Sequence, residues 1–217
     1  MRIPVVLEVA PRRSFASALE WPGWSRGGRT PDDALAALIA YAPRYASVAK
    51  RAGLRFGARR SIDEIEVAER VTGGGSTEFG VPGIVATAED APVSSADLKR
   101  LVALIEACWA TFDEAAGAAK GVTLTTGPRG GGRSLAKIRD HVRDAEVAYI
   151  GQLGARTPDA GRTRETFVAA LSARVEGKPF ERPRNIRTPW PPRYAVRRVA
   201  WHVLDHAWEI EDRSARS

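Results

Sequence analysis

Three histidines, His141, His202 and His206, are the only histidines of the 217-residue chain and its clearest candidates for chemistry. His202 and His206 are four residues apart, so a helix would place both imidazoles on one face, one turn apart. Neutral imidazole nitrogens bind divalent transition metals, and His141 on another helix would supply a third ligand. The alternative is a pair of partly buried, hydrogen-bonded histidines to which His141 is unrelated.

A site of three imidazoles would leave coordination positions open for water, substrate or another ligand. Zinc or nickel suits such a set of nitrogens, and iron(II) or manganese would need added oxygen ligands. The residue after His202 is Val203, so the pair is not the His-Glu-x-x-His motif of zinc peptidases. The pattern therefore favours an open metal site and argues against a peptidase.

The composition is typical of a globular domain, with 44% hydrophobic and 27% charged residues. No apolar run reaches the roughly 18 residues of a membrane span, and Glu8 interrupts the stretch that a signal peptide would continue. The sole cysteine, Cys108, lies on the apolar stripe of a predicted helix and is interpreted as a buried, inert thiol. These features predict a cytoplasmic protein that does not enter membranes.

The formal net charge of +7 permits binding to nucleic acid. The basic residues form no long run and interleave with acidic residues along the chain. We therefore favour dispersed surface arginine over a nucleic-acid interface as the interpretation of this charge.

The first part of the chain has the patterns of a small α+β module, predicted to span residues 1–80. Alternating apolar residues predict strands at residues 3–10, 14–21 and about 62–71. Thr30 as N-cap and Pro31 as first residue predict a helix that continues to residue 52, where Gly53 follows, with Pro43 disturbing its middle.

Residues 81–93, rich in proline and glycine, are predicted to form a linker. From Ser94 onward the apolar period becomes helical, and residues 94–217 are predicted to form the second domain. Its helices are expected from residue 94, at residues 134–153, at 163–175 and at 193–212. The predicted fold class is thus an α+β N-terminal module followed by an all-α antiparallel four-helix bundle.

Residues 94–213 resemble the DinB/YfiT-like superfamily in helix order, in the long third connection and in the places of the histidines. The match rests on His141 in His-Val-Arg-Asp-Ala-Glu and on the segment Trp-His-Val-Leu-Asp-His-Ala-Trp-Glu. The resemblance implies a four-helix bundle that binds a divalent metal through His141, His202 and His206. Some members are transferases that use a low-molecular-weight thiol such as mycothiol, bacillithiol or glutathione.

Three arginines, Arg193, Arg197 and Arg198, cluster at the start of the last helix, one to two turns before His202. They would either bind the carboxylates of an anionic thiol cofactor or form a solvated face. The leading hypothesis is a divalent-metal-binding protein of DinB type. If it is an enzyme, it would be a metal- and thiol-dependent S-transferase, in which a bound thiolate attacks a small electrophile.

Residues 1–55 resemble a HicB-type antitoxin domain. The match rests on the strand at 14–21, on Pro-Gly-Trp-Ser after it, on Gly28, and on Thr-Pro-Asp-Asp-Ala-Leu at 30–35. Trp24 stands where the family often has cysteine. The second hypothesis is a non-catalytic regulatory or protein-interaction module of antitoxin type. Alternatively, the small module packs on the helical bundle or mediates dimerisation, and a homodimer is expected.

Overall fold

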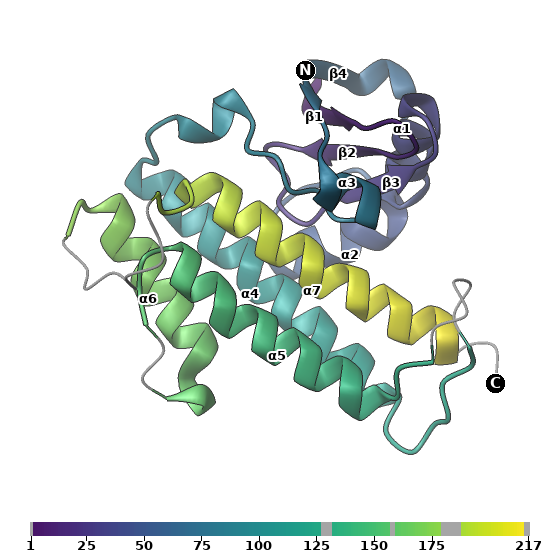
Figure 1. Cartoon of the computed structure of the whole chain (residues 1–217), viewed down its shortest axis with the longest axis vertical. Coiled ribbons are helices and arrows are strands. Elements are labelled where there is room, and N and C mark those ends of the chain that lie inside the picture. Colours follow the sequence, from purple (N-terminus) through teal and green to yellow (C-terminus); the bar gives the residue numbers. More distant parts are fainter. Residues whose placement is uncertain (1, 127–131, 157–158, 179–187, 215–217) are drawn as a thin grey trace. The chain divides into compact units, whose positions relative to one another are not determined.

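The computed structural model describes residues 2–126, 132–156, 159–178 and 188–214 (Figure 1). These residues separate into two compact units, each built from two stretches of the chain. The first unit comprises residues 1–107 and 191–201, and the second comprises residues 108–190 and 202–217. A sheet near the N-terminus is followed by helices, which confirms that part of the predicted fold class.

The first unit contains a four-stranded sheet in the order β3-β2-β1-β4. Its strands are β1 (Ile3–Val9), β2 (Ser14–Ala18), β3 (Ser25–Gly28) and β4 (Ile65–Thr72). β1 is antiparallel to β2 and parallel to β4, so the chain crosses from one edge of the sheet to the other between β3 and β4. The sequence did not predict β3, because its glycines Gly27 and Gly28 have low strand propensity.

Two helices, α1 (Pro31–Ala40) and α2 (Ala42–Arg51), form the connection between β3 and β4. Thr30 caps the start of α1, as the sequence predicts, and it also forms a reciprocal capping box with Asp33. The predicted single helix is interrupted at Tyr41, because Pro43 lacks the N–H that would continue the hydrogen-bond ladder. Gly53, with φ of 72°, ends α2 in the left-handed conformation.

The remaining helices agree closely with the predicted ranges, apart from one short helix at residues 75–79 that the sequence did not predict. They are α3 (Gly75–Phe79), α4 (Ser95–Ala118), α5 (Leu135–Gln152), α6 (Thr163–Val175) and α7 (Pro192–Ser214). Short 3-10 turns occupy Ile62–Glu64, Thr87–Asp90 and Ala160–Arg162. Ser94 and Asp97 cap α4 reciprocally and the Ser134 hydroxyl caps α5, which confirms the starts of both helices.

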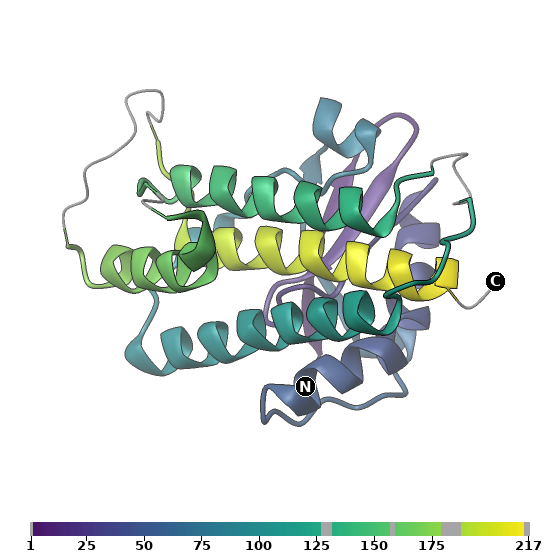
Figure 2. The same cartoon turned by 90° about the horizontal axis from the view of Figure 1, so that it is seen from below.

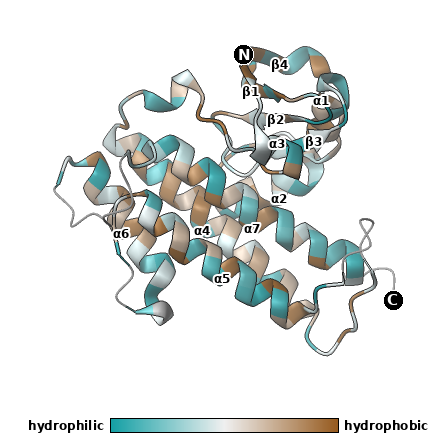
Figure 3. Cartoon of the chain, in the orientation of Figure 1, coloured by the Kyte–Doolittle hydropathy of each residue, from teal (hydrophilic) through white to brown (hydrophobic). Residues whose placement is uncertain are grey.

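The second unit is built on α5 and α6, with the C-terminal parts of α4 and α7. α5 lies beside both α6 and the end of α7 in the two views (Figures 1 and 2). Hydrophobic and hydrophilic residues alternate around these helices (Figure 3), and the hydrophobic side is buried. Ile138 and Ile150 of α5 and Leu171 of α6 are fully buried there, and Phe167 packs edge-on against Trp109 at 5.8 Å between ring centroids. Within the described ranges, every helix is too short or too polar to span a lipid bilayer.

Gly28 allows β3 to pass directly against the first turn of α1. A Cβ at this position would lie 2.3 Å from the backbone nitrogen of Ala34. We expect Gly28→Ala to lower the free energy of unfolding by about 1–3 kcal/mol, since backbone must move to admit the methyl group. Gly117→Ala is the control, because a Cβ on exposed Gly117 of α4 meets nothing within 4 Å. Urea unfolding should show the control unchanged or stabilised by up to about 1 kcal/mol, and equal midpoints for both variants would contradict this packing.

Candidate metal centre

The three histidines of the chain meet in the second unit. His141 comes from the middle of α5, and His202 and His206 come from successive turns of α7. One ligand nitrogen from each lies within 4.8 Å of the other two. The rings are arranged edge to face, with centroids 4.8–5.0 Å apart. The structure therefore brings together the three residues that the sequence nominated as ligands.

The separations of these nitrogens suit a single ion. Two nitrogens bound to one zinc ion at about 2.0–2.1 Å lie about 2.9–3.4 Å apart, depending on the bond angle. The Nε2 atoms of His141 and His202 are 3.1 Å apart. The ligand nitrogens lie within 4.8 Å of one another, so closing the longest separation to this range requires a shift of about 1.5–2 Å, which side-chain rotations can share between two imidazoles.

The imidazole of His206 is held in one orientation by Glu209. Its Nδ1 lies 2.8 Å from Oε2 of Glu209, one turn further along α7. A carboxylate at Nδ1 stabilises the proton there and leaves Nε2 with a free lone pair. Carboxylate partners of this kind support metal-binding histidines in proteins, fixing the ring and raising its basicity.

Arg213 in turn fixes Glu209. Its Nη1 donates to the other carboxylate oxygen of Glu209 at 2.8 Å. The remaining nitrogens of Arg213 donate to the backbone carbonyls of Thr125 and Arg133, at 2.7 and 2.8 Å. Both carbonyls belong to the connection between α4 and α5. The buried Arg213 therefore links this connection to Glu209, which contacts the candidate ligand His206.

The electrostatics of the site favour an unprotonated nitrogen on His141 and an ionised Glu209. Burial lowers the pKa of His141, with further lowering from His206 and Arg133, which keeps its imidazole neutral near pH 7. Burial would raise the pKa of Glu209, but the hydrogen bonds and charges of His206 and Arg213 outweigh it and lower the pKa. The site thus combines an imidazole, His141, whose pKa is lowered by burial with an ionised carboxylate, Glu209.

Aromatic side chains flank the histidines. Tyr149 of α5 packs edge-on against His202 at 5.7 Å between ring centroids, and Trp190 lies 5.5 Å from Tyr149. His202 and His206 are only 7% and 8% exposed, whereas His141 is half-buried. The ring nitrogens therefore lie at the edge of the apolar interior, where the low dielectric strengthens binding of a cation to its ligands.

The three arginines nominated for a thiol cofactor all belong to the first unit and have partners there. Arg193 bonds to Asp97 at 2.8 Å, and Arg197, 1% exposed, bonds to Glu89 at 2.6 and 2.8 Å. The guanidinium of Arg198 lies over the ring of Trp201 at 4.8 Å. Their role in binding a cofactor stays a prediction, while these contacts give Arg193 and Arg197 a structural role within the first unit.

Sequence reasoning missed the buried acids that surround Arg197. Glu8 and Glu89 are 0% and 3% exposed, and Glu8 accepts hydrogen bonds from Thr77 and from the backbone of residues 83 and 84. The available signal was Glu8 itself, a carboxylate inside an otherwise apolar strand. Such a group requires a buried cation or several donors, and both are present.

Removal of the Glu209 carboxylate should weaken metal binding without abolishing it. We expect Glu209→Ala to raise the dissociation constant for Zn²⁺ about 10- to 100-fold, because His206 loses the group that orients it. Competition with a chromogenic chelator measures the constant, and Glu211→Ala on the exposed side of α7 is the control. Equal affinity of the two variants would exclude an orienting role for Glu209.

No protein-family model, curated protein or solved structure matches this chain.

Proposed function

We propose that this chain binds one divalent transition metal ion, zinc or nickel, through the Nε2 atoms of His141, His202 and His206. The observation that carries the proposal is the convergence of three imidazoles from two helices, with nitrogens 3.1 Å apart in the closest pair. Histidines that cluster without a metal would not need the hydrogen bonds by which Glu209 orients His206 and Arg213 orients Glu209.

We further propose that the protein is a thiol-dependent transferase whose helices α4 to α7 form an antiparallel four-helix bundle. A bound metal would act as a Lewis acid, lowering the pKa of a coordinated thiol. The resemblance to the DinB/YfiT-like superfamily suggests mycothiol, bacillithiol or glutathione as the thiol. Three protein ligands would leave a position at which such a molecule binds.

The chain's own cysteine does not serve as the nucleophile in this proposal. Cys108 is fully buried in α4, and burial raises the pKa of its thiol far above neutrality. A buried, protonated thiol is inert. The reactive sulfur would therefore come from a small molecule, while Glu209 and Arg213 keep His206 in place.

Cobalt(II) substitution tests both parts of the proposal. The untagged protein loaded with Co²⁺ should show visible d–d bands that are absent from His202→Ala. Addition of mycothiol, bacillithiol or glutathione should then produce a sulfur-to-cobalt charge-transfer band, and oxidised glutathione is the control. Metal binding without any thiol response would overturn the transferase proposal and favour a non-catalytic regulatory module.

A further inference from the structure

The positive charge of this protein is concentrated in its first 60 residues. Residues 1–60 hold eleven lysines and arginines against four acidic residues, whereas residues 61–217 hold 22 of each. The whole formal charge of +7 therefore belongs to the N-terminal part. Within it, residues 34–62 contain six basic residues and no acid. The interpretation of dispersed arginine interleaved with acidic residues therefore does not hold for this stretch.

The acid-free stretch forms a recess on the first unit. A hollow of about 620 Å³ lies between α2 and residues 54–58, and it is lined by Lys50 and Arg55 with no carboxylate. Its remaining surface includes Pro43, Ala46, Leu54 and Phe56. The recess thus has two cationic side chains, both exposed, beside an apolar floor.

Phe56 in the floor of the recess is packed against several side chains. Phe56 packs edge-on against Trp21, Trp24 and Tyr45, at 4.9–5.1 Å between ring centroids. The guanidinium of Arg60 lies over the Phe56 ring at 4.7 Å and pairs with Glu64 at 2.6 Å. These contacts hold Phe56 in place without a ligand, which reduces the entropy cost of binding against it.

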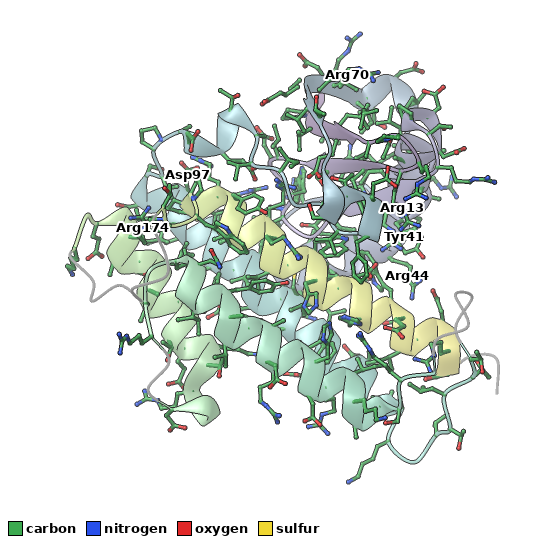
Figure 4. The ribbon with its side chains drawn as sticks, in the orientation of Figure 1. Arg13, Tyr41, Arg44, Arg70, Asp97 and Arg174 are labelled. Carbon is green, nitrogen blue, oxygen red and sulfur yellow. The ribbon has the colours of Figure 1, made fainter. Side chains whose placement is uncertain are left out.

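Basic side chains continue beyond the recess. Arg51 and Arg59 are exposed on either side of residues 52–58. At the start of α2 the guanidinium groups of Arg26 and Arg44 lie 3.8 and 5.3 Å from the centroid of the Tyr41 ring. Figure 4 shows Tyr41 and Arg44 close together on the first unit. A polyanion that enters the recess would meet further positive charge along α2.

We propose that this recess binds a single-stranded nucleic acid. Lys50 and Arg55 would contact successive phosphates, and the apolar floor would receive a base. An unstacked base of a single strand can enter a concave site, whereas the bases of a duplex remain paired and stacked. Arginine predominates over lysine by five to one in residues 34–62, and its planar guanidinium suits bidentate bonds to phosphate.

Other anionic partners fit the recess less well. Four apolar residues of α2, namely Ala42, Tyr45, Val48 and Ala49, are buried, and only the small side chains of Pro43 and Ala46 remain accessible, which is too little apolar surface to insert into a membrane. A run of acidic residues such as polyglutamate would match the charge but has no ring to place against the apolar floor beside the cations. The combination of phosphate-binding cations and an apolar surface favours a nucleotide chain.

Fluorescence anisotropy of a labelled oligouridylate tests the proposal on the full-length protein. Lys50→Glu/Arg55→Glu should weaken binding at least tenfold and reduce the slope of log affinity against log salt by about 0.7 for each phosphate that the variant no longer binds. The salt series would run from about 50 to 200 mM. Lys99→Glu/Lys120→Glu is the control, because it makes the same charge change at exposed positions on and just after α4.

Circular dichroism of both double variants establishes that they remain folded. Similar losses of affinity in the recess and control variants would overturn the proposal, since binding would then follow net charge alone. Stronger competition by polyglutamate than by unlabelled oligouridylate would indicate an acidic protein as the partner instead. Stronger competition by a mixed-sequence duplex would also contradict it.

Discussion

His202→Ala should abolish stoichiometric metal binding. The variant would retain only His141 and His206 as ligands. Loss of a residue that orients a ligand, such as Glu209, raises the dissociation constant by up to roughly 100-fold. Loss of a ligand itself should raise the dissociation constant for Zn²⁺ by more than that. Zinc at about 100 times the dissociation constant should stabilise the wild-type fold by about 2.7 kcal/mol. In a chain of this size that gain corresponds to a rise in Tm of about 5–10 °C, which the variant should lack.

Thermal melts with and without Zn²⁺ measure this effect. Lys137→Ala is the matched control for a ligand variant on α5, since Lys137 is exposed one turn before His141. The control should show the full rise in Tm, and His141→Ala should behave like His202→Ala. A normal response to Zn²⁺ in either histidine variant would show that the metal binds elsewhere on the chain.

Arg197→Met should be the most destabilising single substitution among those considered. Arg197 is 1% exposed, bonds to both oxygens of Glu89, and lies 3.9 Å from the carboxylate of Glu8. Methionine preserves much of the volume but leaves two carboxylates buried without their cation. Breaking a buried pair in this way costs about 3–5 kcal/mol, and urea unfolding at neutral pH measures it.

The loss of unfolding free energy caused by Arg197→Met should increase as the pH rises. Burial raises the pKa of Glu8, and the positive charge of Arg197 opposes that rise. Loss of the arginine raises this folded-state pKa further, so Glu8 is more easily protonated in the folded variant than in its unfolded chain. The difference in stability from wild type should therefore be smallest at about pH 4 and below, where more than half of the unfolded glutamates are protonated, and should grow toward pH 8.

Arg193→Met serves as the control for the Arg197 substitution. Arg193 occupies the same helix and also forms an ion pair, with Asp97, but both partners are partly exposed. Exposed pairs contribute about 0–1 kcal/mol. If Arg197→Met lowers the free energy of unfolding equally little, or by an amount that does not change with pH, Arg197, Glu8 and Glu89 do not form a buried ionic cluster.

Much of the fold follows from local signals in the sequence. Ser94 and Ser134 each have the side chain that satisfies the first free N–H groups of a helix, and both helices start there. Pro43 marks the place where one apolar stripe is divided between two helices. These signals act over a few residues and need no knowledge of the tertiary structure.

Other features depend on residues far apart in the chain. The short strand β3 contains two glycines and forms because β2 pairs with it. Glu8 and Arg197 are separated by 189 positions, and only the folded first unit brings their charges together. The spacing of His202 and His206 predicted a shared helix face, but the distance from His141 to His202 required the packing of α5 beside α7.

The metal content of wild-type protein purified without a histidine tag tests the central claim most directly. After incubation with Zn²⁺ or Ni²⁺ and removal of excess metal, elemental analysis should find one ion per chain. A stoichiometry near zero in protein shown to be folded would contradict the proposed centre and would leave His141, His202 and His206 as a hydrogen-bonded group.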